Sequence, residues 1–245
     1  MTLRRAHERY QDLHARREVW RTFDPKDTGD ALAEGFGALE ILDEDRLGPG
    51  QGEQRAASHD AEIITYVRDG ALAHEDSTGR SGVIQTGEFR RLSIARGVRH
   101  SETNASPTDW AHVFHIRLHT RAVGLASGHE QKRFCTADRR GLMCIVASAD
   151  GQKGSLRIHQ DALVYSVLLE PGQHVIHELA PGRRAWLHVV QGDVTLGDLV
   201  LTTGDGAGLT AERAVSLTAR EDSEFLLVDL AEPLPPLGVR DGEPG

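Results

Sequence analysis

Short apolar runs alternate with glycine-bearing turns along the first half of the chain. Gly35–Leu42 is typical of a strand with a glycine entry, and Asp43-Glu44-Asp45 is its predicted polar exit. Glu62–Val67 runs up to the turn at Asp69-Gly70, and another apolar run covers His112–Leu118. Strands of this length and spacing predict an all-β sandwich or barrel.

The second half of the chain repeats this style. Leu163–Leu169 ends at a Glu-Pro-Gly turn, and Ala185–Val190 ends at Gln191-Gly192. Ile63–Gly70 resembles Trp186–Gly192, which indicates a degenerate internal duplication with one small barrel in each half. Residues 233–245, rich in proline and charge, are expected to form a disordered tail.

Composition and charge narrow the classes of function. The chain has 245 residues and a net charge of −9, which argues against non-specific binding to nucleic acid or to an anionic membrane. Met1–Val19 contains no apolar block typical of a signal peptide, and no run approaches the roughly 20 apolar residues of a membrane span. We therefore expect a cytoplasmic protein, and a monomer because two barrels can cover each other's sheet edges.

The two cysteines are too few for a disulfide framework. Cys135 and Cys144 lack the close spacing of a zinc knuckle or a thioredoxin motif, so we expect reduced, partly buried thiols. The alternative is a redox switch between the two barrels, which the nearby Arg133, Arg139 and Arg140 would favour by lowering a thiol pKa.

The strongest candidate metal ligands in the sequence lie in the triplet His100-Ser101-Glu102. His100 and Glu102 are two residues apart, so on a strand their side chains project from the same face. An imidazole and a carboxylate placed in this way can share one cation. The triplet therefore predicts half of a metal site.

An ordered set of short motifs connects the chain to a known family. The motifs are Gly50-Gln51-Gly52, Glu62-Ile63-Ile64-Thr65-Tyr66-Val67, Gly70, His74-Glu75-Asp76-Ser77-Thr78-Gly79, Gly87-Glu88-Phe89 and Arg99-His100-Ser101-Glu102. Further matches follow in Gly154–Asp161 and between Arg183 and Leu230. In their order and spacing these motifs resemble the pirin family of bicupins, over most of the chain.

This resemblance implies two tandem cupin β-barrels, an N-terminal barrel over residues 1–125 and a C-terminal barrel over residues 126–232. Typical pirins hold one iron-like metal in the first barrel through a His-x-His pair, a later His and a Glu. The later His and Glu fall on His100 and Glu102, whereas the His-x-His pair falls on Ala56 and Ser58. The resemblance thus implies a degraded metal site, and the second barrel, which has neither motif, is expected to be metal-free.

Other residues could complete the site. Glu62 shares strand parity with positions 56 and 58, and the corresponding carboxylate is a ligand in ordinary cupins; the alternative is a hydrogen-bonding role at the strand edge. Asp60 lies on the same predicted face, and His59 would reach the cavity only through a β-bulge. Such a carboxylate-rich set suits iron, manganese or a similar divalent ion.

His115 lies on the strand that follows. Phe114, Ile116 and Leu118 form one apolar face there, which places His115 with Arg117 and His119 on the other face. Which face lines the cavity is left open by the sequence. A structural role is the simpler interpretation for this histidine, as it is for most of the thirteen in the chain.

Two functions follow from these observations. The first is a bicupin with weak or no metal that binds a small molecule in its N-terminal barrel or regulates a protein partner. The alternative is a mononuclear-metal dioxygenase of the quercetin 2,3-dioxygenase type, which the family resemblance implies for members with a complete site.

Overall fold

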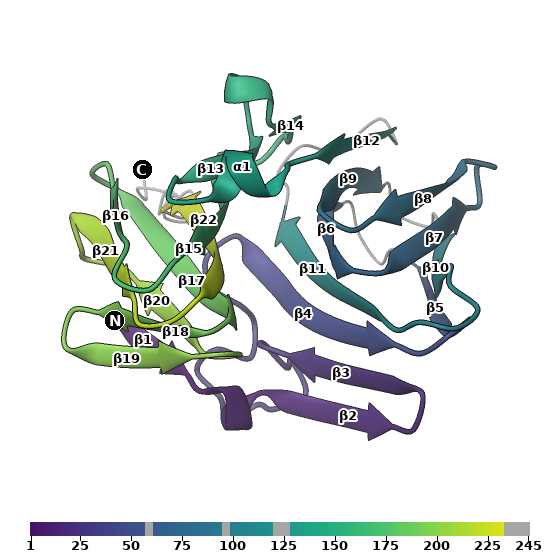
Figure 1. Cartoon of the computed structure of the whole chain (residues 1–245), viewed down its shortest axis with the longest axis horizontal. Helices are drawn as coiled ribbons and strands as arrows, with labels where there is room; N and C mark the ends of the chain where they lie inside the picture. Colours follow the sequence, from purple (N-terminus) through teal and green to yellow (C-terminus); the bar gives the residue numbers. More distant parts are fainter. Residues whose placement is uncertain (57–60, 95–98, 120–127, 233–245) are drawn as a thin grey trace, which may run out of the picture.

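The computed structural model describes residues 1–56, 61–94, 99–119 and 128–232. Two β-barrels lie side by side, with the N-terminal barrel on the right of Figure 1 and the C-terminal barrel on the left. The only helical segments in the described residues are η1 (Ala6–Glu8), α1 (Thr136–Arg139) and η2 (Gln152–Gly154). The predicted all-β fold is confirmed.

The N-terminal barrel consists of a seven-stranded and a four-stranded antiparallel sheet. The larger sheet has the order β12-β9-β6-β11-β4-β3-β2 and the smaller has the order β5-β10-β7-β8. Their strands are β2 (Tyr10–His14), β3 (Arg17–Arg21), β4 (Leu39–Leu47), β5 (Gly52–Ala56), β6 (Ala61–Asp69), β7 (Ala71–Asp76), β8 (Ser81–Gln85), β9 (Glu88–Ile94), β10 (Arg99–Asn104), β11 (Ala111–His119) and β12 (Gly128–Arg133).

The C-terminal barrel repeats this plan, with sheets of order β1-β20-β17-β22-β15-β13-β14 and β16-β21-β18-β19. Its strands are β1 (Thr2–Arg4), β13 (Cys144–Ser148), β14 (Leu156–Arg157), β15 (Ala162–Leu169), β16 (His174–Glu178), β17 (Arg183–Gln191), β18 (Asp193–Leu196), β19 (Leu199–Thr202), β20 (Gly206–Leu209), β21 (Ala214–Ala219) and β22 (Ser223–Ala231).

The two larger sheets pack face to face and share one hydrophobic core. On β6, Ile64 and Tyr66 point toward the second barrel and pack in the core that contains Trp186. The alternate residue Val67 points into the first barrel and packs against Leu72. Both faces of β6 are therefore buried, which explains why its sequence is a continuous apolar run rather than an alternating one.

Strand β4 differs from its prediction. The sequence ends this strand at Asp43-Glu44-Asp45, whereas the structure continues it to Leu47 with these three acidic residues buried. Glu44 can be buried because Arg9 and His112 each contact its carboxylate at 2.8 Å. The acidic residues thus belong to buried polar clusters rather than to a turn.

Strand β1 lies apart from the rest of the N-terminal half. Although the N-terminal barrel was expected to cover residues 1–125, Leu3 pairs with Ala207 in the sheet of the C-terminal barrel (Figure 1). Asp205 fixes the segment that follows, by accepting hydrogen bonds from Arg5 Nη1 at 2.7 Å and from the Ala6 amide at 2.8 Å. Strand β1 therefore belongs to the second barrel.

Three further sequence predictions concern the boundary between the domains, the C-terminal tail and the lack of a membrane span. The predicted boundary between residues 125 and 126, and the predicted disordered tail at 233–245, lie outside the described residues. Within the described part of the chain, no helix is long and apolar enough to cross a membrane.

Candidate functional site

A polar cluster around Glu102 fills part of the N-terminal barrel. Strand β10 places His100, Glu102 and Asn104 on its inner face, where all three are buried. Gly52 lets β5 pack closely on this strand, because a Cβ atom at that position would lie 2.2 Å from the Glu102 carbonyl oxygen. The glycine of the Gly50-Gln51-Gly52 motif thus has a packing role beside the candidate site.

Glu102 is held by an internal arginine. Arg90, on β9, donates from Nη2 to Glu102 Oε1 at 2.6 Å, and the two side chains are only 2% and 9% exposed. Burial lowers the pKa of Arg90 and the Glu102 charge opposes that shift, so the guanidinium stays charged. The two residues form a buried, charge-assisted ion pair.

Two further strands complete the cluster. His115 on β11 brings Nε2 within 3.5 Å of Glu102 Oε2 and within 3.5 Å of Asp45 Oδ2 on β4. Thr65 on β6 donates its hydroxyl to Glu102 Oε1 at 3.5 Å. The face of β11 that the sequence left open is therefore settled, because His115 faces the barrel interior.

His74 on β7 lies directly opposite Glu102 in the β7–β10 pairing. Burial lowers the pKa of His74 to about 4, and the positive charge of Arg90 adds to this shift while Glu102 opposes it. His74 is therefore a neutral imidazole at pH 7. A cavity of only about 10 Å³ separates it from Arg90 and His100, about the smallest space that holds one water.

A larger cavity of about 410 Å³ lies at the end of the barrel between β4, β5 and β11. Phe23, Pro25, Ala33 and Ile41 give it apolar walls; its charged lining residues are Arg21, Asp24, Lys26, Glu34, Glu40, Asp43, Glu53 and Arg117. Asp43 stands directly opposite His115 in the β4–β11 pairing. The cavity thus borders the polar cluster and has the size of a small-molecule site.

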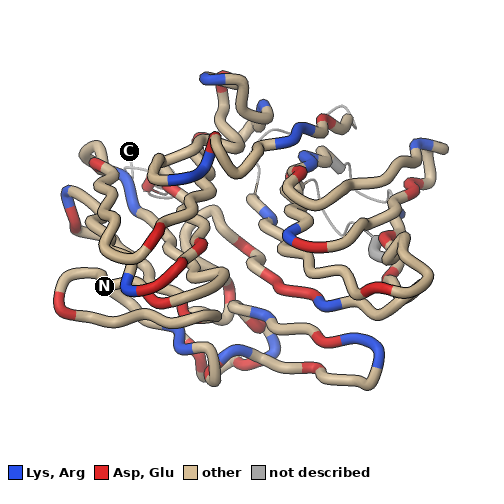
Figure 2. The backbone as a smooth tube through the Cα atoms, in the orientation of Figure 1, with Lys and Arg blue, Asp and Glu red and all other residues tan. Residues whose placement is uncertain are grey.

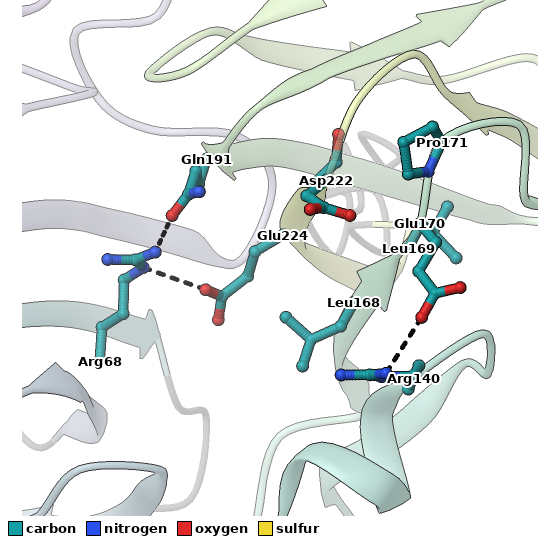
Figure 3. A pocket seen from close by; sticks show the side chains of 10 residues that line it. Arg68, Arg140, Leu168, Leu169, Glu170, Pro171, Gln191, Asp222 and Glu224 are labelled. Carbon is teal, nitrogen blue, oxygen red and sulfur yellow. Dashed lines mark hydrogen bonds and ion pairs between the residues drawn. The ribbon is translucent and has the colours of Figure 1, made fainter.

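A second cavity of about 450 Å³ lies between the two barrels (Figure 3). On one side Arg68 reaches from β6 to Gln191 and donates from Nε to Glu224 at 3.0 Å. The Tyr66 hydroxyl donates to the same carboxylate at 2.6 Å, and Arg139 Nη1 donates to it at 3.1 Å. Because Glu224 is satisfied from both barrels, this network fastens the barrels together.

Glu62 does not join the cluster. Its side chain is fully buried on the face of β6 opposite to Thr65, where its carboxylate accepts bonds from the His159 amide at 2.6 Å and the Gln160 amide at 3.1 Å. The parity argument that favoured it as a ligand assumed one continuous strand. In the structure β5 and β6 belong to different sheets. The alternation of side-chain faces therefore cannot be counted from position 56 to Glu62.

The other positions considered for the site are not described by the structure. Ser58, His59 and Asp60 lie outside the described residues, as does the side chain of Ala56. Where the structure is described, no three His, Cys, Asp or Glu side chains are grouped so that they could hold a metal ion. His100 and Glu102 lie on one buried face of β10, as their spacing predicted, and Arg90 contacts Glu102 there.

The cysteines differ in exposure. Cys144 is half-buried as expected, whereas Cys135 is exposed because it precedes the surface helix α1. Burial raises the pKa of the Cys144 thiol. This shift opposes the redox-switch alternative, which requires a lowered thiol pKa.

Comparison with known proteins decides the family. The Pirin family model matches residues 3–117, and the Quercetinase C-terminal cupin domain model matches residues 145–230. Quercetin 2,3-dioxygenase of Escherichia coli is 37% identical over 228 residues, which are 93% of this chain and 97% of that protein. The chain belongs to the pirin family. The pirin-like protein of Caulobacter vibrioides is 34% identical over 80% of this chain and 84% of its own length.

Solved structures give the same result for this pirin-family chain. The crystal structure of YhhW from Escherichia coli has a TM-score of 0.86 and 34% identity, and covers 96% of this chain and 99% of that one. A second crystal structure holds YhhW in complex with nickel(II), with a TM-score of 0.85, 34% identity and coverage of 95% and 99%. The predicted family and the tandem cupin fold are confirmed.

The residues of this pirin do not fit a resident metal ion as they lie. The carboxylate at the family's metal-ligand position already accepts the Arg90 guanidinium at 2.6 Å. A divalent ion on the same oxygen would be repelled by that fixed positive charge. No catalytic step through a metal follows from this arrangement.

Sequence reasoning missed Arg90, His74, Thr65 and Asp45 as members of the cluster. The signal for Arg90 is the Arg90-Arg91 pair inside an otherwise apolar strand run, since one of two adjacent strand residues must face the interior. His74 stands in the quoted His74–Gly79 motif, but only the strand pairing shows that it faces Glu102.

Proposed function

We propose that this pirin-family bicupin works without a tightly bound metal, as a small-molecule-binding or regulatory protein. One observation carries the proposal: Arg90 and Glu102 form a buried ion pair at the position where the family resemblance implies a metal ligand. This pair supplies a positive charge inside the barrel, so the carboxylate needs no metal ion to be buried.

The cavity at the end of the N-terminal barrel is the proposed ligand site. Apolar walls from Phe23 and Ile41 suit the body of a small organic molecule, and Arg21 and Arg117 suit polar or anionic groups at its edge. A ligand bound there would change the surroundings of His115, because His115 pairs across the sheet with the lining residue Asp43.

The proposal extends to partners and location. Acidic and basic residues are mixed along both barrels (Figure 2), which supports the absence of direct nucleic-acid or membrane binding. We propose a monomer in the cytoplasm that passes a ligand signal to a protein partner.

Elemental analysis tests the proposal on protein purified without chelator or histidine tag. Wild type is compared with His100→Ala and with the control His174→Ala, which alters an exposed histidine of the second barrel. We expect iron, manganese and nickel far below one ion per chain in all three proteins. A stoichiometric metal content that only His100→Ala abolishes would overturn the proposal.

The second candidate function is a flavonol dioxygenase. It is favoured by the 37% identity to a protein named quercetin 2,3-dioxygenase. Oxygen consumption with quercetin, measured after incubation with Fe²⁺ or Ni²⁺, separates the two functions. Quercetin binding without oxygen consumption supports the first, whereas turnover that His100→Ala abolishes supports the second.

A further inference from the structure

Arg90 is a cation built into the interior of the N-terminal barrel. Its guanidinium is almost fully buried and lies 2.6 Å from Glu102 Oε1. Arginine does not lose its proton in proteins, so this charge is present at every physiological pH. The guanidinium thus sits permanently against a carboxylate oxygen that could otherwise bind a metal ion.

Three buried imidazoles lie on β7, β10 and β11, the strands around the same carboxylate. His115 Nε2 is 3.5 Å from Glu102 Oε2, His74 stands directly across the strand pair, and His100 shares the inner face of β10. Imidazole nitrogens with one carboxylate form a donor set that first-row transition ions accept. These side chains lie on neighbouring strands, but with Arg90 among them the described residues are not grouped to hold a metal ion.

A guanidinium and a divalent ion exclude each other here. Both require Glu102 as their counter-charge, and two cations at contact distance in a buried site repel each other strongly. The guanidinium also fills space next to His74 and His100, where a cavity of only about 10 Å³ is left. Removal of the arginine would relieve both the repulsion and the crowding.

We infer that Arg90 takes the place of a divalent metal, and that its loss opens a transition-metal site formed by Glu102 with His74, His100 and His115. The inference rests on the proposed function, because it supposes that the wild-type barrel holds metal weakly or not at all. It differs from the arrangement that the family resemblance implies. There the other two imidazoles come from positions 56 and 58, which are Ala56 and Ser58 in this chain, whereas here they come from His74 and His115.

Nickel binding to full-length variants tests this inference. Arg90→Gln removes the charge and shortens the side chain, whereas the matched control Arg90→Lys keeps a positive charge. Each protein is dialysed against Ni²⁺, and bound nickel is measured by elemental analysis together with the shift in melting temperature. We expect Arg90→Gln to bind nickel at least about tenfold more tightly than wild type, a change typical of altering a group in contact with a ligand.

The expected pattern has two further parts. Arg90→Lys should bind as weakly as wild type, and the double variants Arg90→Gln/His74→Ala and Arg90→Gln/His115→Ala should lose the gained affinity. Equal nickel affinity in Arg90→Gln and wild type would overturn the inference. A gain that survives both double variants would also overturn it, because the metal would then lie elsewhere.

Two outcomes need separate treatment. If Arg90→Gln is insoluble, it is expressed with nickel in the medium; soluble, nickel-loaded protein supports the inference, and insolubility with nickel present overturns it. One tightly bound nickel in wild type, lost in His100→Ala, would instead contradict the proposed function. The two failures are therefore distinguishable.

Discussion

The two barrels share one architecture but fill their interiors with different chemistry. Strand β6 (Ala61–Asp69) corresponds residue by residue to β17 (Arg183–Gln191), and both are followed by a glycine with positive φ. The strand pairings then match Thr65 with Leu187, Arg90 with Ala207, Glu102 with Leu217, His115 with Leu227 and Asp45 with Val167. Every member of the polar cluster has an aliphatic counterpart.

This difference shows what the polar cluster is not for. The five counterparts in the second barrel belong to its hydrophobic core, so a cupin barrel of this size folds with apolar residues at these positions. Buried ion pairs give little net stability compared with well-packed apolar residues. The cluster of the first barrel is therefore better explained by function than by folding.

The strongest test breaks the ion pair on one side only. Glu102→Leu copies Leu217 of the second barrel and leaves the Arg90 guanidinium buried without its carboxylate. We expect a loss of about 3–5 kcal/mol in the free energy of unfolding, measured by urea titration.

The matched double variant Arg90→Ala/Glu102→Leu copies both second-barrel residues, Ala207 and Leu217. It should recover most of the stability that Glu102→Leu loses, because neither charge is then left buried alone. A double variant as unstable as Glu102→Leu would show that the first barrel needs its polar interior in order to fold.

A second test concerns Glu62, whose counterpart in the second barrel is Arg184. Glu62→Leu leaves the part-buried amides of His159 and Gln160 without their acceptor, so we expect a loss of about 1–2 kcal/mol in unfolding free energy. Metal content should stay unchanged. A selective change in metal content would return Glu62 to the site.

A third test uses pH and concerns His188. This residue occupies the position on β17 that Tyr66 occupies on β6. Burial lowers the pKa of His188 to about 3, and the nearby Arg9 charge adds to the shift. Between pH 6.5 and about 3, His188 is therefore protonated in the unfolded chain but neutral in the folded protein. The free energy of unfolding then falls as the pH falls through this window, by about 1.4 kcal/mol per pH unit.

Thermal unfolding between pH 7 and 5 checks this prediction, with His188→Phe as the comparison. His74 contributes in the same direction because its pKa is also lowered. We expect His188→Phe to be less acid-sensitive than wild type. An identical pH profile for both proteins would contradict the assignment.

The smallest expected effect is that of metal removal. Dialysis against EDTA should leave the melting temperature of wild type unchanged, because Arg90 supplies the cation at Glu102. The Arg90→Gln variant loaded with nickel should lose stability under the same treatment. A clear fall in the melting temperature of wild type would count against a metal-free barrel.

Sequence patterns predicted the fold well because strand alternation and glycine turns are local. The repeated run before Gly70 and Gly192 indicated two barrels, and the spacing of His100 and Glu102 correctly placed both on one inner face. The sequence left Glu62 open between a metal ligand and a hydrogen-bonding residue, and the structure shows hydrogen bonding to the His159 and Gln160 amides. Arg90 was missed because only the pairing of β6 with β9 shows which of two adjacent arginines faces inward.

The place of β1 has a consequence for synthesis of the protein. Thr2–Arg4 is synthesised about two hundred residues before its pairing partners in Gly206–Leu209. Because such distant pairing delays chain closure, the second barrel cannot complete its sheet until Gly206–Leu209 has been made. Bulky fusions placed directly before Thr2 should therefore slow maturation more than fusions after residue 232.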